Sequence, residues 1–295
     1  MSTDPVQPEP YGFGALDAGR SRLDTSRFVV LPVPYEQTTT FVGGTRAGPD
    51  AILRASREME LWDEDLGAEV ADVGIHTRPP LEACATGPGD MVERVRRAVA
   101  ELVAADKIPV LLGGEHTVSV GAVRAAVERN PDLVTLVLDA HADLRDAYRG
   151  SPYSHACSTR RISELCPVVQ VGVRSLSAEE AEFLRGRDWA LTYAREVRSG
   201  KDWIGPLISR LENRPVYLSV DLDVFDPGVM PAVGTPEPGG LSWDDGMALV
   251  RALASASRIV AFDLVELSPI PGLIAPDFFA AKLVYKIMGQ VAAAR

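Results

Sequence analysis

The chain has 295 residues, of which 46% are hydrophobic and 24% charged, an ordinary composition for a soluble globular protein with a sizeable core. Its formal net charge of −11 argues against nucleic acid as a partner; an acidic surface attracts cationic small molecules, although such acidity also serves solubility. No apolar run approaches the ~18 residues of a membrane span, and no signal peptide is visible. The three cysteines lack metal-finger or disulfide-framework spacing, so we expect a cytoplasmic protein.

The start of the chain differs in composition from the rest. Residues 1–26 are rich in Pro, Gly and charge and show no periodicity, so they are predicted to form an irregular arm. Residues 27–295 contain no internal repeat and no interior linker, which predicts a single domain. Within it, residues 27–34 are predicted to form a first buried strand that ends at a proline, and a helix is expected over residues 49–61 with Pro49 in its first turn.

Strand and helix patterns alternate through the remaining sequence. Apolar runs rich in β-formers predict strands at 109–114, 133–138, 168–173, 215–220 and 258–267. Helical spacing or a capping box predicts helices at 91–103, at 120–127, after Ser177, after Ser242 and at 278–294. Strands that alternate with helices predict an α/β fold with a parallel sheet covered on both faces.

A possible metal site follows the strand predicted at 133–138. Asp139, His141 and Asp143 occupy every second position, and alternate side chains of an extended chain point to the same side. Two carboxylates and an imidazole suit a divalent ion of the manganese, iron or zinc type. A surface loop with two solvated Asp residues and a chance His would show the same pattern, so the triplet alone does not decide.

Other potential ligands follow three more predicted strands: His116, the pair Asp221 and Asp223, and Glu266. Each has an ordinary alternative. His116 could be a structural histidine, the two aspartates could be turn formers, and Glu266 could be a solvated strand end. Ligands of an open parallel sheet bind beyond the carboxyl ends of its strands, so we expect these side chains to lie together. Two His and four Asp residues are too many carboxylates for one structural zinc ion and suit two hard divalent ions.

Three segments resemble the signatures of the ureohydrolase family, which includes arginase and agmatinase. They are Gly113-Gly114-Glu115-His116, Asp139-Ala140-His141-Ala142-Asp143 and Ser219-Val220-Asp221-Leu222-Asp223-Val224-Phe225-Asp226-Pro227. The resemblance runs from about Phe28 to the C-terminus, and one departure is Glu115, where Asp is commoner. It implies a three-layer α/β/α sandwich with a central, mostly parallel sheet, two Mn²⁺ ions and a homotrimer or homohexamer.

The resemblance also implies a role for each matched residue. One ion would be held by His116, Asp139, Asp143 and Asp221, and the other by Asp139, His141, Asp221 and Asp223. A hydroxide bridging the ions would attack the guanidinium carbon of a cationic guanidino substrate and release urea. Asp143 would pass a proton to the departing amine, and Glu266 would pair with the guanidinium. Thr235 would line the pocket, and His155, otherwise a plain loop histidine, would shuttle protons to solvent.

The substrate is suggested by segments in which the chain differs from arginases. Arginases resemble one another in an Asn two residues after the metal triplet and in a later Arg-Asp-x-Asp run. Here these positions hold Arg145 and Arg174-Ser175-Leu176-Ser177, with no acid, so the clamp for an amino acid is missing. Residues 153–161 resemble agmatinases instead. Our hypothesis is hydrolysis of agmatine to putrescine and urea in polyamine biosynthesis, and the near alternative is N1-aminopropylagmatine, which would give spermidine.

Other hydrolases with the same metal set are rivals. A guanidinobutyrase or formimidoylglutamase acts on a substrate with a carboxylate, which Arg145 or Arg149 would favour. An arginase is less expected because the clamp is missing. A non-catalytic relative with a binding role would be indicated by lost metal ligands, and all six are present.

Overall fold

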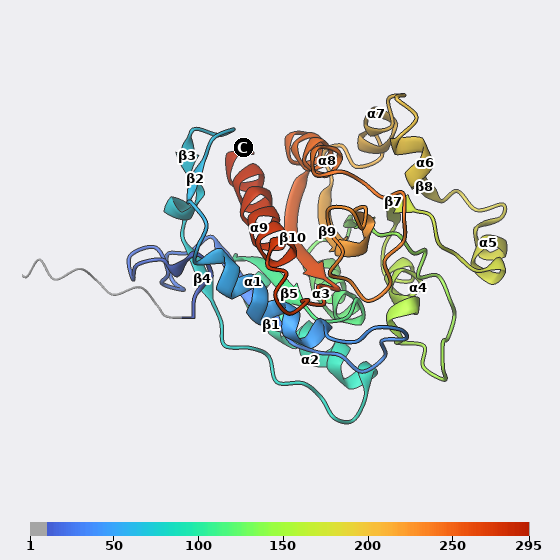
Figure 1. The fold of residues 1–295 in the computed structure, drawn as a ribbon, viewed down its shortest axis with the longest axis horizontal. Coiled ribbons are helices and arrows are strands. Elements are labelled where there is room, and N and C mark those ends of the chain that lie inside the picture. Colours follow the sequence, from blue (N-terminus) through green and yellow to red (C-terminus); the bar gives the residue numbers. More distant parts are fainter. Residues whose placement is uncertain (1–10, 295) are drawn as a thin grey trace, which may run out of the picture.

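The computed structural model describes residues 11–294, and a parallel sheet of eight strands forms its centre (Figure 1). The strand order is β4-β1-β5-β10-β9-β6-β7-β8, and every pairing in this sheet is parallel, as predicted. The strands are β1 (Phe28–Val33), β4 (Ile75–Thr77), β5 (Ile108–Gly113), β6 (Val134–Leu138), β7 (Val168–Val173), β8 (Ala190–Tyr193), β9 (Pro215–Asp221) and β10 (Arg258–Val265). A separate antiparallel hairpin joins β2 (Trp62–Asp63) and β3 (Ala68–Glu69).

The helices follow the predicted alternation and add short elements that the sequence pattern did not indicate. They are α1 (Gly48–Ser56), α2 (Pro88–Ala104), α3 (Thr117–Arg129), α4 (Ser158–Ser163), α5 (Ala178–Leu184), α6 (Ala194–Val197), α7 (Ile204–Ile208), α8 (Trp243–Ala256) and α9 (Ala275–Ala293). The expected capping boxes are present at Ser177 and Ser242. The first helix ends at Ser56 rather than near residue 61, because the chain turns there to bury Met59 and enter the β2–β3 hairpin.

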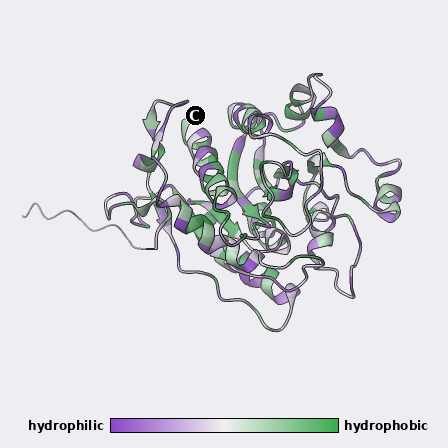
Figure 2. Cartoon of the chain, viewed as in Figure 1, coloured by the Kyte–Doolittle hydropathy of each residue, from purple (hydrophilic) through white to green (hydrophobic). Residues whose placement is uncertain are grey.

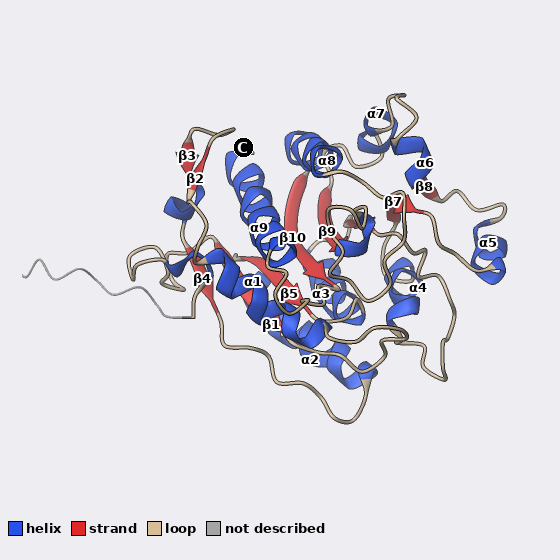
Figure 3. Cartoon of the chain, viewed as in Figure 1, coloured by secondary structure: helices blue, strands red, loops and turns tan. Residues whose placement is uncertain are grey.

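Helices cover both faces of the sheet, as Figure 3 shows. Alternate residues of each strand point to opposite faces. In β5, Val110 and Leu112 belong to the core shared with α1, α8 and α9, whereas Leu111 belongs to the core shared with α2 and α3. Figure 2 shows the strands mostly in hydrophobic colours and the outer helix faces in hydrophilic ones. This is the predicted three-layer α/β/α sandwich.

The sheet order explains why the candidate ligands meet. Strands β5, β10, β9 and β6 are consecutive neighbours in the centre of the sheet, although they are distant in sequence. Because all of them run in the same direction, their carboxyl ends share one edge. The segments that follow these four strands are the ones that contain the candidate ligands.

The segment before β1 is more closely packed than an arm on the surface. Residues 1–10 of the predicted arm lie outside the described residues. Residues 11–26 are irregular apart from a short 3-10 turn, η1 (Phe13–Ala15). However, Phe13 and Leu16 are buried in the core beside α1 and α9, so this segment helps to cover the sheet. Between residues 11 and 294, no helix is long and apolar enough to cross a membrane.

Candidate active site

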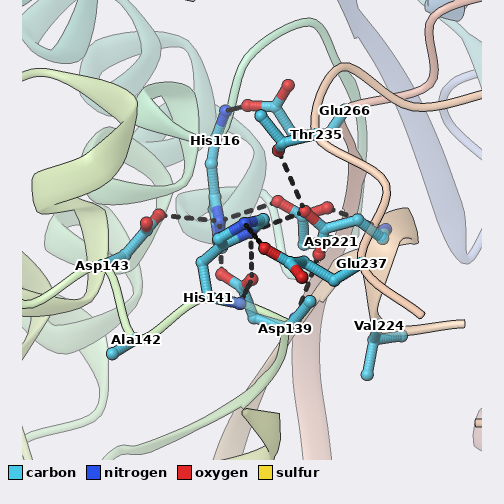
Figure 4. A network of polar contacts seen from close by, with 12 residues as sticks. His116, Asp139, His141, Ala142, Asp143, Asp221, Val224, Thr235, Glu237 and Glu266 are labelled. Atoms are coloured by element: carbon cyan, nitrogen blue, oxygen red, sulfur yellow. Dashed lines mark hydrogen bonds and ion pairs between the residues drawn. The ribbon is translucent and has the colours of Figure 1, made fainter. Parts of the chain in front are cut away.

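Two groups of side chains that could hold a metal ion lie at the carboxyl ends of the central strands (Figure 4). One group consists of His116, Asp139 and Asp221, and the other of Asp139, His141 and Asp223. In each group, one potential ligand atom from every member lies within 4.8 Å of the others. Asp139 belongs to both groups, so its carboxylate lies between two possible ion positions.

A tight turn after β5 brings His116 into the site. A Cβ at Gly114 would lie 1.9 Å from the carbonyl oxygen of Tyr35, so only glycine fits at this position. The turn lets α3 begin at Thr117 and buries His116 fully at its N-cap position. The His116 Nδ1 atom lies 3.2 Å from an Asp139 oxygen, 3.3 Å from Asp221 and 3.5 Å from Asp143.

The segment after β6 is not the straight extension that we expected. Beyond Leu138 the chain leaves the strand conformation, and only His141 forms an isolated bridge, to Ser175 of the neighbouring segment. Asp143 has a left-handed backbone with φ of 51°, which is uncommon for a residue with a side chain. The three side chains still meet the same site, because this turn brings the Asp143 carboxylate towards His116.

Hydrogen bonds to the backbone hold the two carboxylates that follow β9. The Asp223 backbone N–H donates to Asp221 Oδ1 at 2.9 Å, and the Ala140 N–H donates to Asp223 Oδ1 at 3.0 Å. The second bond ties the end of β9 to the loop after β6. Asp223 Oδ2 also accepts a long contact of 3.5 Å from the Thr235 hydroxyl and lies 2.8 Å from His141 Nδ1.

In the metal-free chain, the close packing of acidic side chains shifts the pKa values of the residues in this site. Burial, together with the neighbouring charges of Asp223 and Asp143, raises the pKa of Asp139 to about 8. Burial alone would lower the pKa of His141, but Asp223 and the other acids outweigh it and raise that pKa to about 11. Burial would raise the pKa of Asp223, but its contact with His141 lowers it to about 2. These groups therefore share protons that a bound cation would displace.

Two buried atoms at the centre have no hydrogen bond of acceptable geometry to any described residue. They are His116 Nδ1 and Asp139 Oδ2, 3.2 Å apart. Buried polar atoms are rarely left without a partner, and such exceptions call for an explanation such as an ion. An imidazole nitrogen without a hydrogen-bond partner, placed among carboxylate oxygens, is a donor set for divalent Mn, Fe or Zn once its proton is displaced. These residues therefore fit the two metal ions that the sequence predicts.

A cavity of about 270 Å³ opens above these groups. Its lining contains nearly all the predicted catalytic residues: His141, Asp143, His155, Asp221, Asp223, Thr235 and Glu266. Glu266 has a left-handed backbone with φ of 66°, and its Oε1 accepts a bond of 2.6 Å from the His116 backbone N–H. Its carboxylate also lies 3.9 Å from His155 Nδ1, and burial raises its pKa well above the usual range. His116 and Asp139 are fully buried beneath the cavity.

The loop after β1 forms one wall of this cavity and contacts His155. The Thr40 hydroxyl lies 3.3 Å from His155 Nε2, and the His155 backbone N–H donates to Thr38 Oγ1 at 2.9 Å. Glu115 holds the loop, because its Oε2 accepts bonds from the backbone N–H groups of Gln37 (2.8 Å) and Thr38 (2.6 Å). The residue that departs from the family pattern thus supports the cavity wall.

Sequence analysis missed several residues of the cavity wall. Thr40, Tyr148 and Glu180 line it, and no motif identified them. Glu180 was visible only as the capping partner of Ser177. Its Oε1 also accepts from the Leu144 N–H at 2.9 Å, which brings it beside the metal triplet. The region after β7 therefore does contribute an acid to the cavity. It lies three residues beyond the Arg174-Ser175-Leu176-Ser177 run, which itself contains none.

Comparisons with known proteins agree with this geometry. The sequence profile described as the Arginase family matches residues 26–289. The chain belongs to the arginase family of ureohydrolases. It is similar to the N(1)-aminopropylagmatine ureohydrolase of Synechocystis sp., with 41% identity over 268 residues that cover 88% of each protein. It is also similar to the agmatinase of Pyrococcus horikoshii, with 32% identity over 90% of this chain and 92% of that protein.

A solved structure gives the same result for the fold. The agmatine ureohydrolase of Thermoplasma volcanium superposes with a TM-score of 0.87 and 31% identity, covering 96% of this chain and 95% of that chain. The protein is thus a ureohydrolase of the agmatinase type, a hydrolase that acts on linear amidines. Members of the arginase family have binuclear metal sites, in agreement with the two His/Asp groups found here.

Proposed function

We propose that this ureohydrolase cleaves N1-aminopropylagmatine to spermidine and urea. The observation that carries this proposal is the identity of 41% to the aminopropylagmatine enzyme of Synechocystis sp., against 32% to the agmatinase of P. horikoshii. The sequence hypothesis placed agmatine first, and the comparisons favour its alternative. Both substrates present a guanidinium group on an aliphatic chain and differ in the length and charge of the other end.

We further propose that two Mn²⁺ ions bind at the carboxyl ends of the central strands. The ligands of one would be His116, Asp139, Asp143 and Asp221, and those of the other Asp139, His141, Asp221 and Asp223. When bound, such ions stabilise developing negative charge and make water a stronger nucleophile near neutral pH. The His116 Nδ1 and Asp139 Oδ2 atoms, which are buried without a hydrogen-bond partner, support this assignment.

The remaining residues of the cavity would bind and orient the guanidinium group. Glu266 is buried and gains its charged form when a cation approaches, so it would pair with the guanidinium and hold its carbon above the ions. Asp143 would transfer a proton to the departing amine. His155, which also lines the cavity, would exchange protons with solvent, and Thr235 would contact the guanidinium edge.

The cavity wall that extends away from Glu266 would hold the aliphatic tail. Leu176, Tyr148 and Glu180 line the same cavity, and we propose that they form this wall. An apolar surface with one carboxylate suits a chain of methylenes that carries an amine. We therefore propose Glu180 as the residue that contacts a distal ammonium group.

One observation favours a second candidate, a guanidino acid such as guanidinobutyrate. Arg145 lines the same cavity, and among residues 11–294 no ion pair with a carboxylate is found for its guanidinium group. Its Cζ atom lies 4.6 Å from the centre of the Tyr148 ring. An unpaired cation at this place would repel a polyamine tail and attract a carboxylate.

Urea release with four substrates side by side tests the proposal. We expect kcat/KM to fall in the order aminopropylagmatine, agmatine, guanidinobutyrate, arginine. Glu180→Gln should lower kcat/KM for aminopropylagmatine about 10-fold, the cost of a hydrogen bond to a charged group, and leave guanidinobutyrate unchanged. Arg145→Gln is the matched control, because it removes a positive charge from the same cavity where Glu180→Gln removes a negative one. It should not lower kcat/KM for aminopropylagmatine. If guanidinobutyrate is the best substrate and Arg145→Gln abolishes its turnover, the second candidate replaces the first.

The family resemblance leads us to propose a homotrimer or homohexamer as well. Light scattering of the purified protein measures the mass directly, and a mass equal to one chain of 31.7 kDa would contradict this assembly.

A further inference from the structure

A fully buried polar network lies on the side of the metal site away from the cavity. It consists of Tyr217 and Ser219 on β9, Asp263 on β10 and Ser119 on α3, all with no exposed surface. None of these residues lines the cavity, so none can touch a substrate held there. Burying a carboxylate costs several kcal/mol even when it is well paired, and an apolar residue would fill the layer between sheet and helix without that cost.

The network ends at the metal-ligand candidate His116. Asp263 Oδ2 accepts a bond of 2.6 Å from the Tyr217 hydroxyl, and Asp263 Oδ1 accepts one of 2.8 Å from the Ser219 hydroxyl. The Ser219 Oγ atom in turn lies 3.1 Å from His116 Nε2. A continuous path of hydrogen bonds thus joins the buried carboxylate to the side of the imidazole that faces away from the acids.

The donors and acceptors along this path determine which nitrogen of His116 has the proton. A serine hydroxyl has one proton, and here its shortest contact directs that proton to Asp263. Its oxygen is then an acceptor towards His116, so Nε2 must be the protonated nitrogen. The other nitrogen, Nδ1, is left with its lone pair, and it is the atom that faces Asp139, Asp143 and Asp221.

The second histidine of the site lacks such support. His141 has Nδ1 at 2.8 Å from Asp223 and Nε2 at 3.8 Å from Glu237, a residue that is half-buried near the surface. On the Nε2 side of its ring, the described residues offer only this long contact to Glu237 and no buried hydroxyl. Any effect of the network should therefore fall on one of the two ion positions.

We propose that Asp263, acting through the Ser219 hydroxyl, is a positioning residue that presents the bare Nδ1 of His116 to one metal ion. This inference rests on the proposed two-ion site. Partners of this kind hold a ligating histidine in the correct tautomer, and their loss commonly weakens metal binding about 10- to 100-fold. The network explains why the layer between β9, β10 and α3 contains a buried acid and two hydroxyl groups at the point nearest to His116.

Mn²⁺ titration of the metal-stripped enzyme, followed by calorimetry and by electron paramagnetic resonance, tests the proposal. Asp263→Asn offers an amide N–H to Ser219, which turns the serine proton towards His116 and selects the wrong tautomer. Ser219→Ala removes the link itself. In each variant we expect one Mn²⁺ position to weaken about 10- to 100-fold while the other keeps its affinity, with loss of the coupled two-ion signal.

Two controls separate positioning from general damage to the core. Tyr217→Phe removes the other hydrogen bond to Asp263 without touching the link to His116, so both ions should bind as in the wild type. Ser219→Thr retains a hydroxyl and should restore binding relative to Ser219→Ala. The double variant Ser219→Ala with Asp263→Asn should bind Mn²⁺ no more weakly than either single variant, because both act on one path.

The outcomes distinguish this inference from the function on which it rests. A wild-type protein that binds no Mn²⁺ contradicts the two-ion site and the inference together. A wild type with two ions, together with a Ser219→Ala variant of unchanged Mn²⁺ affinity, overturns only the inference. Additive losses in the double variant also overturn it. If Asp263→Asn does not fold, Ser219→Ala, which removes a single oxygen, decides.

Discussion

Two clusters of acidic residues in this protein, each with at least one fully buried carboxylate, differ in the source of their positive charge. In the first, Lys286 of α9 is nearly buried, and its Nζ lies 3.1 Å from Asp63, 2.9 Å from Glu64 and 3.0 Å from Asp65. In the second, the ion-pair partners of the carboxylates at the ends of the central strands are histidines. Among residues 11–294, no Lys or Arg forms an ion pair with them.

The difference shows in the proton affinities of the two clusters. Burial lowers the pKa of Lys286, but its three carboxylate partners outweigh that effect, and the net shift is upward, so the lysine stays charged. At the strand ends, burial and like charges raise the pKa of Asp139 to about 8. A buried acid whose partner is supplied by the chain is structural. A group of several buried acids that share no lysine or arginine suits a cation from solution, and on this comparison we propose the cluster at the strand ends as the functional one.

The largest expected effect comes from removing a shared carboxylate at the strand ends. Asp221→Ala should lower kcat for urea release about 1,000-fold or more, since metal ions contribute several kcal/mol of charge stabilisation. The fold should persist, because the variant also removes a like charge from beside Asp223 and Asp139. Steady-state kinetics with metal analysis checks this, and full activity with two bound ions would refute the ligand assignment.

Removing the lysine from the other cluster should lower the stability of the fold and leave the catalytic activity unchanged. Lys286→Met leaves Asp63 fully buried without its cation, which should cost about 3–5 kcal/mol of unfolding free energy. Activity per folded molecule should stay at the wild-type level. Denaturant unfolding measures the loss, and Lys282→Met is the matched control. Among residues 11–294 Lys282 forms no ion pair; its Nζ makes a long bond of 3.4 Å to a backbone carbonyl and lies 5.9 Å from the centre of the Tyr285 ring. Equal stability of both variants would show that the cluster contributes little.

Glu266→Gln should affect substrate binding while leaving the metals in place. The amide retains an oxygen for the His116 backbone N–H but loses the charge that would pair with a guanidinium. A hydrogen bond to a charged group contributes about 1.5–3 kcal/mol, so kcat/KM should fall about 10- to 100-fold. Mn²⁺ content should stay at the wild-type value. An unchanged kcat/KM would remove Glu266 from the guanidinium site.

The smallest expected effect is a difference between Lys286→Met and the wild type in how stability depends on pH. The hydrogen bond from Lys286 lowers the pKa of Glu64 from its ordinary value of 4.5, so this group stabilises the fold above that pH and loses the contribution as pH falls. Glu64 is 69% exposed, and screening limits such a pair to roughly 0–1 kcal/mol. The stability of Lys286→Met should therefore fall less steeply below about pH 4.5 than that of the wild type. Plots of unfolding free energy against pH that run parallel for the variant and the wild type would contradict this.

The sequence predicted the elements with strong periodicity and missed those fixed by tertiary contacts. The strand at 168–173 is observed with the predicted bounds, β6 and β9 differ by one residue at one end, and β5 is shifted by one residue at both ends. The short edge strands β4 and β8 were not predicted. They have few residues, and their conformation depends on pairing with β1 and β7.

The candidate site shows the same division. The ligands in short motifs were predicted, because parallel strands bring their carboxyl ends together wherever they lie in the sequence. The backbone of Asp143 was not, since its positive φ depends on the surrounding loops. Asp263 and Glu180 were also missed. One looked like an ordinary strand residue and the other like a helix cap, and only the folded contacts show what each one touches.

The central claim is that the acids at the strand ends bind two cations supplied from solution. Equilibrium dialysis of the metal-stripped protein against Mn²⁺, with the bound metal measured per chain, tests it most directly. The account predicts two ions per chain, with urea release from aminopropylagmatine recovered as the second ion binds. Binding of one ion or none, with the chain folded, would contradict it.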